Sequence, residues 1–182
     1  MIFPIVLYGD PVLKKKASEV AEGDESVKEF VDSMYETMYA AQGVGLAAPQ
    51  VGESLRVFVI DTTPMEDDEE DGLKMAFINP IMIDELGEEW AFEEGCLSIP
   101  GVRADVNRKP EIRIEYFDEN WELHEETFDG MKARVIQHEY DHIEGKLFTD
   151  YLTPFKKRLI KGKLANISKG KTDAEYRVKI PR

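Results

Sequence analysis

Apolar residues three and four positions apart predict helices before and after the middle of the chain. Ser26 and Glu29 have the spacing of a capping box, and the apolar stripe that begins after them ends at Gly43. The same periodicity predicts a helix over residues 130–143, with Asp129 as its N-cap. A capping side chain followed directly by proline predicts two more helix starts, at Asp10-Pro11 and Thr153-Pro154.

The middle of the chain alternates apolar and polar residues with a period of two, which predicts β-strands. The clearest alternation covers residues 111–117, and the turn at 118–120 joins it to a second strand at 121–128 in a hairpin. Shorter β-rich runs predict strands at 56–61, at 75–79 and, as an added edge strand after the last helix, at 176–180. Helices come before and after a group of mostly antiparallel strands along the chain, and this order predicts an α+β fold. We expect residues 1–182 to form a single domain.

Composition narrows the class of protein. The 182 residues are 42% hydrophobic and 33% charged, which is ordinary for a globular domain. No stretch approaches the roughly 20 apolar residues of a membrane span, and the N-terminus lacks the features of a secretory signal. A single cysteine excludes an intramolecular disulfide and fits a reducing compartment. We therefore expect a cytoplasmic protein with no membrane association.

Charge is unevenly distributed along the chain. The net charge of −14 argues against DNA binding, which favours a basic surface. Six consecutive acidic residues, 66–71, predict an exposed loop over 64–73, since like charges repel and resist burial. The C-terminal segment 151–182 is basic, with a balance of +8. It is either a solvated helix surface or a contact for RNA or an acidic partner.

The strongest local motif is an HExxH sequence in the predicted helix 130–143. Residues four apart share one helix face, so His138 and His142 can bind one metal ion. Glu139, next to the first ligand, can act as a base toward a metal-bound water. The alternative is a pair of ordinary helix histidines.

A catalytic site of this type needs a third protein ligand. No histidine follows His142, and Glu144 is too close to it in the helix. Cys96 is the only thiol, and its thiolate would be a strong, soft ligand. A small buried apolar residue is the alternative role for this cysteine. The adjacent Gly95 permits close backbone approach and favours the ligand role.

A third segment, Gly43 to Gln50, reads GVGLAAPQ. Its two glycines permit a substrate backbone to lie against the chain, and the amide of Gln50 offers a neutral donor. Taken alone, the glycines are better explained by a helix end and a turn.

Together these segments resemble peptide deformylase. The resemblance is carried by GVGLAAPQ at 43–50, EGCLSIP at 94–100 and QHEYDH at 137–142, in family order. It implies a compact α+β domain in which antiparallel strands surround a central helix that carries the HExxH motif. It also implies that Cys96, His138 and His142 bind one divalent metal ion, with Fe²⁺ as the native metal and Zn²⁺, Ni²⁺ or Co²⁺ as possible substitutes.

The resemblance further implies removal of the N-formyl group from the formyl-methionine of nascent proteins. Glu139 would take a proton from the metal-bound water and pass it to the leaving amine, while the Gln50 amide and the Leu97 N–H would hold the oxyanion. Five residues would contact the peptide or its methionine side chain: Val44, Gly45, Glu94, Gly95 and Val135. The basic C-terminal segment would offer a weak ribosome contact.

Two other functions fit the same residues. A zinc-dependent endopeptidase also uses HExxH, but it would leave the Cys96 segment unexplained. A catalytically inactive binding module of the same fold is the other alternative. Degenerate forms usually lose the glutamate or a ligand, and this chain has both Glu139 and all three predicted ligands.

Overall fold

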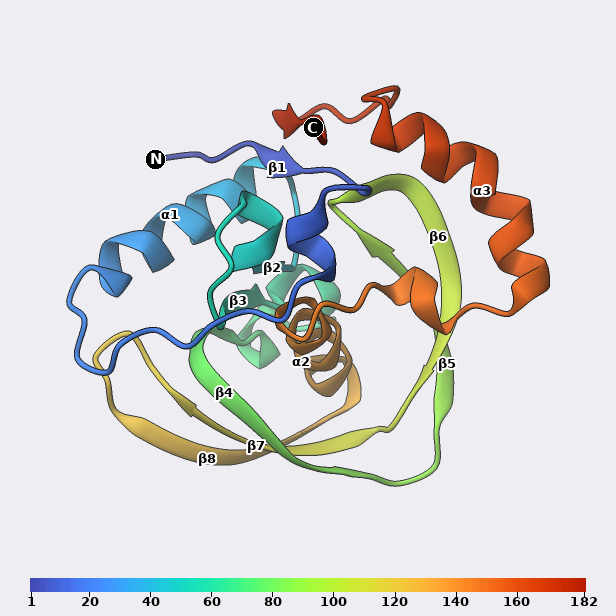
Figure 1. Cartoon of the computed structure of the whole chain (residues 1–182). Helices are drawn as coiled ribbons and strands as arrows, with labels where there is room; N and C mark the ends of the chain where they lie inside the picture. The colour runs from blue at the N-terminus through green and yellow to red at the C-terminus, as the bar shows by residue number, and fades with distance from the viewer.

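The computed structural model describes all residues, 1–182, and arranges them around helix α2 (Gly130–Ile143). Figure 1 shows α2 in the middle of the molecule, with strands curving around it and helix α1 (Val27–Ala40) on one side. Helix α3 (Pro154–Ser168) lies on the opposite side. The predicted α+β fold with a central HExxH helix is confirmed.

The main sheet has five antiparallel strands in the order β2-β3-β4-β7-β8. Their bounds are Gly45–Ala47 for β2, Val57–Asp61 for β3, Lys74–Leu86 for β4, Glu111–Phe117 for β7 and Leu123–Asp129 for β8. The predicted strand 111–117 is confirmed as β7. Its hairpin partner begins at Leu123 rather than at Trp121, whose backbone lies in the left-handed region with φ of 62°.

Two smaller sheets complete the fold. Strands β5 (Trp90–Cys96) and β6 (Ile99–Arg108) form an antiparallel hairpin that the sequence analysis did not predict. Strands β1 (Ile5–Val6) and β9 (Val178–Lys179) pair in parallel, so the two ends of the chain lie side by side. The predicted edge strand at 176–180 is therefore present, although it is shorter.

The core divides into parts on either side of β2 and β3. Apolar residues of α1 pack on one side, and those of α2 with β4 and β7 pack on the other. A third apolar group lies among β6, α3 and the N-terminal segment. Because β2 contacts both α1 and α2, the core fixes this strand firmly beside the HExxH helix.

The helices begin close to where they were predicted, but two of the predicted caps are wrong. Asp129 precedes α2 without making a side-chain capping hydrogen bond. Thr153 caps α3 by accepting the Lys156 N–H at 3.2 Å, as the sequence indicated. The predicted capping box at Ser26 is wrong, because the Ser26 hydroxyl donates to Asp24 at 2.7 Å instead. The helix that follows still forms, since burial of its apolar face supplies most of its stability.

Short 3-10 helices at Pro11–Lys14, Ala48–Val51, Thr63–Met65, Glu69–Asp71 and Phe148–Tyr151 fill several of the connections. The acidic side chains from Asp67 to Asp71 are exposed. No helix of the structure is both long enough and apolar enough to cross a bilayer.

Candidate metal centre

Two histidines on α2 and one cysteine at the end of β5 bring three metal-binding atoms together. The donor atoms of Cys96, His138 and His142 lie within 4.8 Å of one another. Cys96 Sγ is 3.5 Å from a ring nitrogen of His142, Nε2. One helical turn separates the two histidines, so they share a face of α2. The structure thus unites the three ligands predicted from separate motifs.

The surroundings of these side chains fit a divalent metal ion. Nδ1 of His138 lies 2.8 Å from a Glu94 carboxylate oxygen, which orients the ring and leaves its other nitrogen for the ion. The buried atoms His142 Nδ1 and Glu139 Oε2 have no hydrogen-bond partner. Two imidazoles and a thiolate suit several first-row divalent metals, and three protein ligands leave a coordination position for water or substrate.

Glu94 is the centre of a buried ion-pair network behind His138. Its carboxylate is 5% exposed and accepts two hydrogen bonds from Arg108, at 2.7 and 3.0 Å, and one from Arg134 at 2.7 Å. Burial opposes its ionisation, but hydrogen bonds from His138 and Arg108 hold the pKa of Glu94 well below its usual range. Its side chain therefore supports a ligand, and only its backbone remains for contact with a peptide.

Glu139 points into the core of the site rather than into solvent. It is 4% exposed and packs against the backbone of Gly45, where an added Cβ would stand 2.7 Å from its Oε1. Glycine is therefore required at this position of β2. Burial raises the pKa of Glu139 to about 7, a value suited to taking up and releasing a proton near neutral pH.

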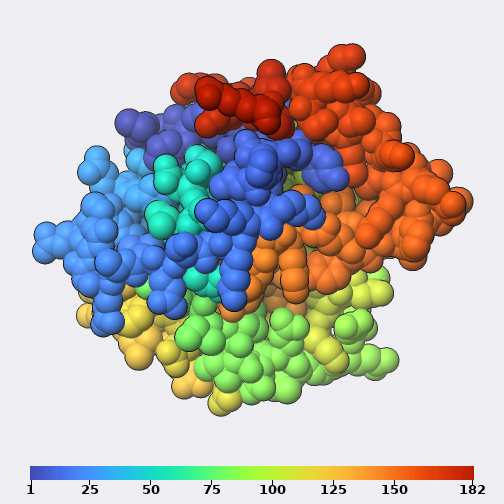
Figure 2. Space-filling view, in the orientation of Figure 1, coloured from blue at the N-terminus to red at the C-terminus, as the bar shows by residue number.

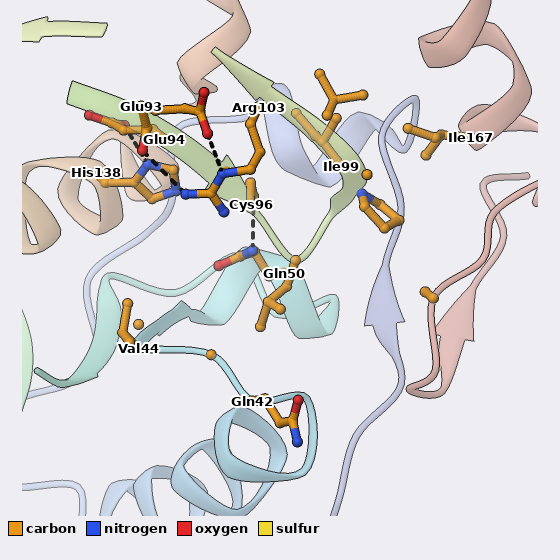
Figure 3. Close-up of a pocket in the computed structure, with 18 of the residues that line it drawn as sticks. Gln42, Val44, Gln50, Glu93, Glu94, Cys96, Ile99, Arg103, His138 and Ile167 are labelled. Carbon is orange, nitrogen blue, oxygen red and sulfur yellow. Dashed lines mark hydrogen bonds and ion pairs between the residues drawn. The ribbon is translucent and has the colours of Figure 1, made fainter. Parts of the chain in front are cut away.

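Gln50, in the 3-10 helix after β2, is held in one orientation. Its side-chain oxygen accepts the Ala47 N–H at 3.0 Å, which directs the amide nitrogen the other way. That nitrogen lies 3.3 Å from Cys96 Sγ and 3.2 Å from the hydroxyl oxygen of Ser98. Figure 3 shows the Gln50 amide directed toward the cysteine. A neutral donor thus stands beside the metal ligands.

A cleft of about 880 Å³ opens over these residues. It lies between β2 and β5, each of which is hydrogen-bonded to only one neighbouring strand. Both strands therefore turn an unpaired edge toward it, a setting that suits an extended peptide. Every site residue predicted from the sequence lines the cleft except His142, which is 1% exposed: Val44, Gly45, Gln50, Glu94, Gly95, Cys96, Leu97, Val135, His138 and Glu139.

The cleft has a wall that the sequence analysis did not anticipate. Residues 171–174 and Tyr176, between α3 and β9, line it on the side away from α2. The Tyr176 hydroxyl donates to the Leu97 carbonyl at 2.6 Å, and burial raises the pKa of Tyr176 to about 12. No motif marks this residue, because its place depends on pairing between the two ends of the chain.

The Cys/His/His set, next to the buried glutamate of the HExxH helix and beneath an open cleft, defines a metal-dependent hydrolase. A family model described as polypeptide deformylase matches residues 2–158. The chain belongs to the peptide deformylase family, whose members are metallohydrolases that remove an N-formyl group.

The similarity to individual relatives extends over nearly the full length of those proteins. The peptide deformylases of Christiangramia forsetii and Cytophaga hutchinsonii are each 60% identical to this chain; the matches cover all of it and 97% and 98% of those proteins. Among solved structures, the peptide deformylase of Ehrlichia chaffeensis has a TM-score of 0.85 at 35% identity, covering 93% of this chain and 98% of that one.

Proposed function

We propose that this deformylase acts on the formyl-methionine of nascent peptides, through the roles that the site residues can take. The observation that carries the proposal is the convergence of a buried glutamate, a fixed amide donor and three metal-binding atoms in and beneath one cleft. An extended peptide would pair with the free edges of β2, at Gly45, and β5, at Glu94 and Gly95. Val44 and Val135 would contact its methionine side chain.

The chemistry divides among the residues of the site. When bound by Cys96, His138 and His142, a divalent ion supplies Lewis acidity, which lowers the pKa of water and polarises a carbonyl oxygen. Glu139 takes a proton from the attacking water and delivers it to the amine that leaves. The formyl oxygen becomes an oxyanion, and the Gln50 amide and the Leu97 N–H donate to it.

Three observations support these assignments. Glu139 has an unpaired buried oxygen, so its carboxylate is free to accept a proton. The Gln50 amide nitrogen lies beside Cys96 in a fixed orientation. The Leu97 N–H makes no hydrogen bond within the protein. We further propose Fe²⁺ as the native metal and the cytoplasm as the compartment, because a thiolate with two imidazoles accommodates ferrous iron in a reducing environment.

Formate release tests the proposed reaction. Protein purified anaerobically with Fe²⁺ or Ni²⁺ is expected to release formate from formyl-Met-Ala-Ser and to leave acetyl-Met-Ala-Ser intact. An internal peptide is expected to stay uncut, which separates this activity from that of an endopeptidase. Absence of formate, with one metal ion bound per chain, would overturn the proposal in favour of the peptidase or the inactive module.

Helix α3 supports a second proposal, a contact with the ribosome. Five of its side chains are basic and exposed: Lys156, Lys157, Arg158, Lys161 and Lys163. Figure 2 shows α3 protruding from the body of the molecule. Because such contacts depend on phosphate charge, changing all five to glutamate is expected to abolish co-sedimentation with ribosomes at low salt. Co-sedimentation that survives the change would refute this contact.

A further inference from the structure

The two-residue turn Leu97-Ser98, which joins β5 to β6, is held from outside its own hairpin. The carbonyl of Ser98 accepts the backbone N–H of Tyr8 at 2.8 Å. The carbonyl of Leu97 accepts the hydroxyl of Tyr176 at 2.6 Å. Each carbonyl of the turn is thus bound by a segment close to one end of the chain.

These two segments are joined to each other. Tyr8 follows β1 and Tyr176 precedes β9, and the two strands pair in parallel, with the Ile5 N–H donating to the Arg177 carbonyl at 2.9 Å. The ring of Tyr176 packs against the core around α1 and β2. In Figure 2 the last residues of the chain lie directly against the first ones. The position of the Tyr176 hydroxyl is therefore set by tertiary structure.

The turn lies directly beside the metal ligands, where the orientation of its backbone groups matters. Leu97 directly follows the ligand Cys96, and its own N–H has no acceptor within the protein. On its other side, the Leu97 side chain occupies space that Gly43 leaves free, since an added Cβ there would stand 2.8 Å from Leu97 Cδ1. With its carbonyl bound and its side chain packed, Leu97 has little freedom to reorient its N–H.

We propose that Tyr176 is a positioning residue for deformylation, and that its hydrogen bond to the Leu97 carbonyl fixes the direction of the Leu97 N–H. This inference rests on the proposed function of that N–H as an oxyanion donor. Such donors accelerate a reaction only when they are already aimed at the developing charge. A small displacement of a reacting group can cost as much as two orders of magnitude in rate. The C-terminal segment is then part of the catalytic apparatus as well as a wall of the cleft.

The change Tyr176→Phe tests this role, because it removes the hydroxyl and keeps the ring in its apolar contacts. We expect kcat for formyl-Met-Ala-Ser to fall about tenfold, less than the 10²–10³-fold cost of deleting an oxyanion donor outright. KM should stay unchanged, since an oxyanion donor acts in the transition state and not on bound substrate. The melting temperature and the metal content should match those of the parent.

A matched control is Tyr116→Phe, which removes the hydroxyl of a buried tyrosine that donates to Glu126 at 3.1 Å, between β7 and β8 and outside the cleft lining. This variant should keep the parent's kcat. An unchanged kcat in Tyr176→Phe would overturn the proposal, and so would a loss of activity explained by lost metal or a lower melting temperature. If the parent itself releases no formate, the proposed function fails instead, which the assay of the parent reveals first.

Discussion

Replacing Glu139 with glutamine is expected to lower kcat for formate release by about 10²–10⁴-fold, the usual contribution of a positioned acid–base group. The amide has the same shape as the carboxylate, so it can keep the packing against Gly45. It cannot take up the proton of the attacking water. Metal analysis should still find one ion per chain, because Glu139 is not among the three ligand atoms that cluster.

The control for this variant is Glu144→Gln, at the end of the same helix. Glu144 pairs with Arg56 at 2.7 Å and does not line the cleft, so its loss should leave kcat close to that of the parent. A Glu139→Gln enzyme with nearly full activity would show that another group moves the proton.

The change Glu94→Gln is expected to cause a large loss of stability. Arg108 and Arg134 are 5% and 2% exposed. Arg134 would lose its carboxylate partner in the interior, and Arg108 would keep only Asp141, at 2.8 Å. Breaking a buried ion pair on one side costs about 3–5 kcal/mol, because a buried charge is left unpaired. For a domain of this size that corresponds to a fall in melting temperature of roughly 6–20 °C.

The neighbouring residue provides the comparison. Glu93 pairs with Arg103 at 3.0 Å, but both side chains are 61% exposed, so Glu93→Gln should cost no more than about 1 kcal/mol. Metal affinity should also separate the variants. Losing the carboxylate that orients His138 is expected to weaken binding by about 10–100-fold in Glu94→Gln alone. Equal melting curves for the two variants would contradict a central role for Glu94.

The helices could be predicted well because the residues that cap a helix and form its apolar face lie only a few positions apart in the sequence. The cap at Thr153 and the apolar period of α2 depend on residues a few positions apart. The hairpin of β5 and β6 escaped prediction because its pattern is interrupted. Gly101 lies at φ 78°, and the buried residues Ile99 and Val102 are three positions apart rather than two. The bulged strand therefore lacks the expected alternation.

The metal ligands could be predicted because HExxH fixes a spacing on one helix and only one cysteine exists in the chain. The support for those ligands was harder to foresee. The sequence assigns the backbone at Glu94 to contact with the peptide. The structure adds a role for its side chain, which is buried between two arginines and His138. Tyr176 lies 79 residues from the carbonyl it binds, so no short pattern could reveal that contact.

The two unpaired strand edges that face each other across the cleft bear on the range of substrates that this enzyme can accept. Hydrogen bonds to a strand edge involve the peptide backbone, which is nearly the same in every protein. An enzyme that binds its substrate in this way needs to contact side chains only at the formylated end. The proposed pairing would therefore let one cleft accept many proteins with differing N-terminal sequences while selecting for the formyl group.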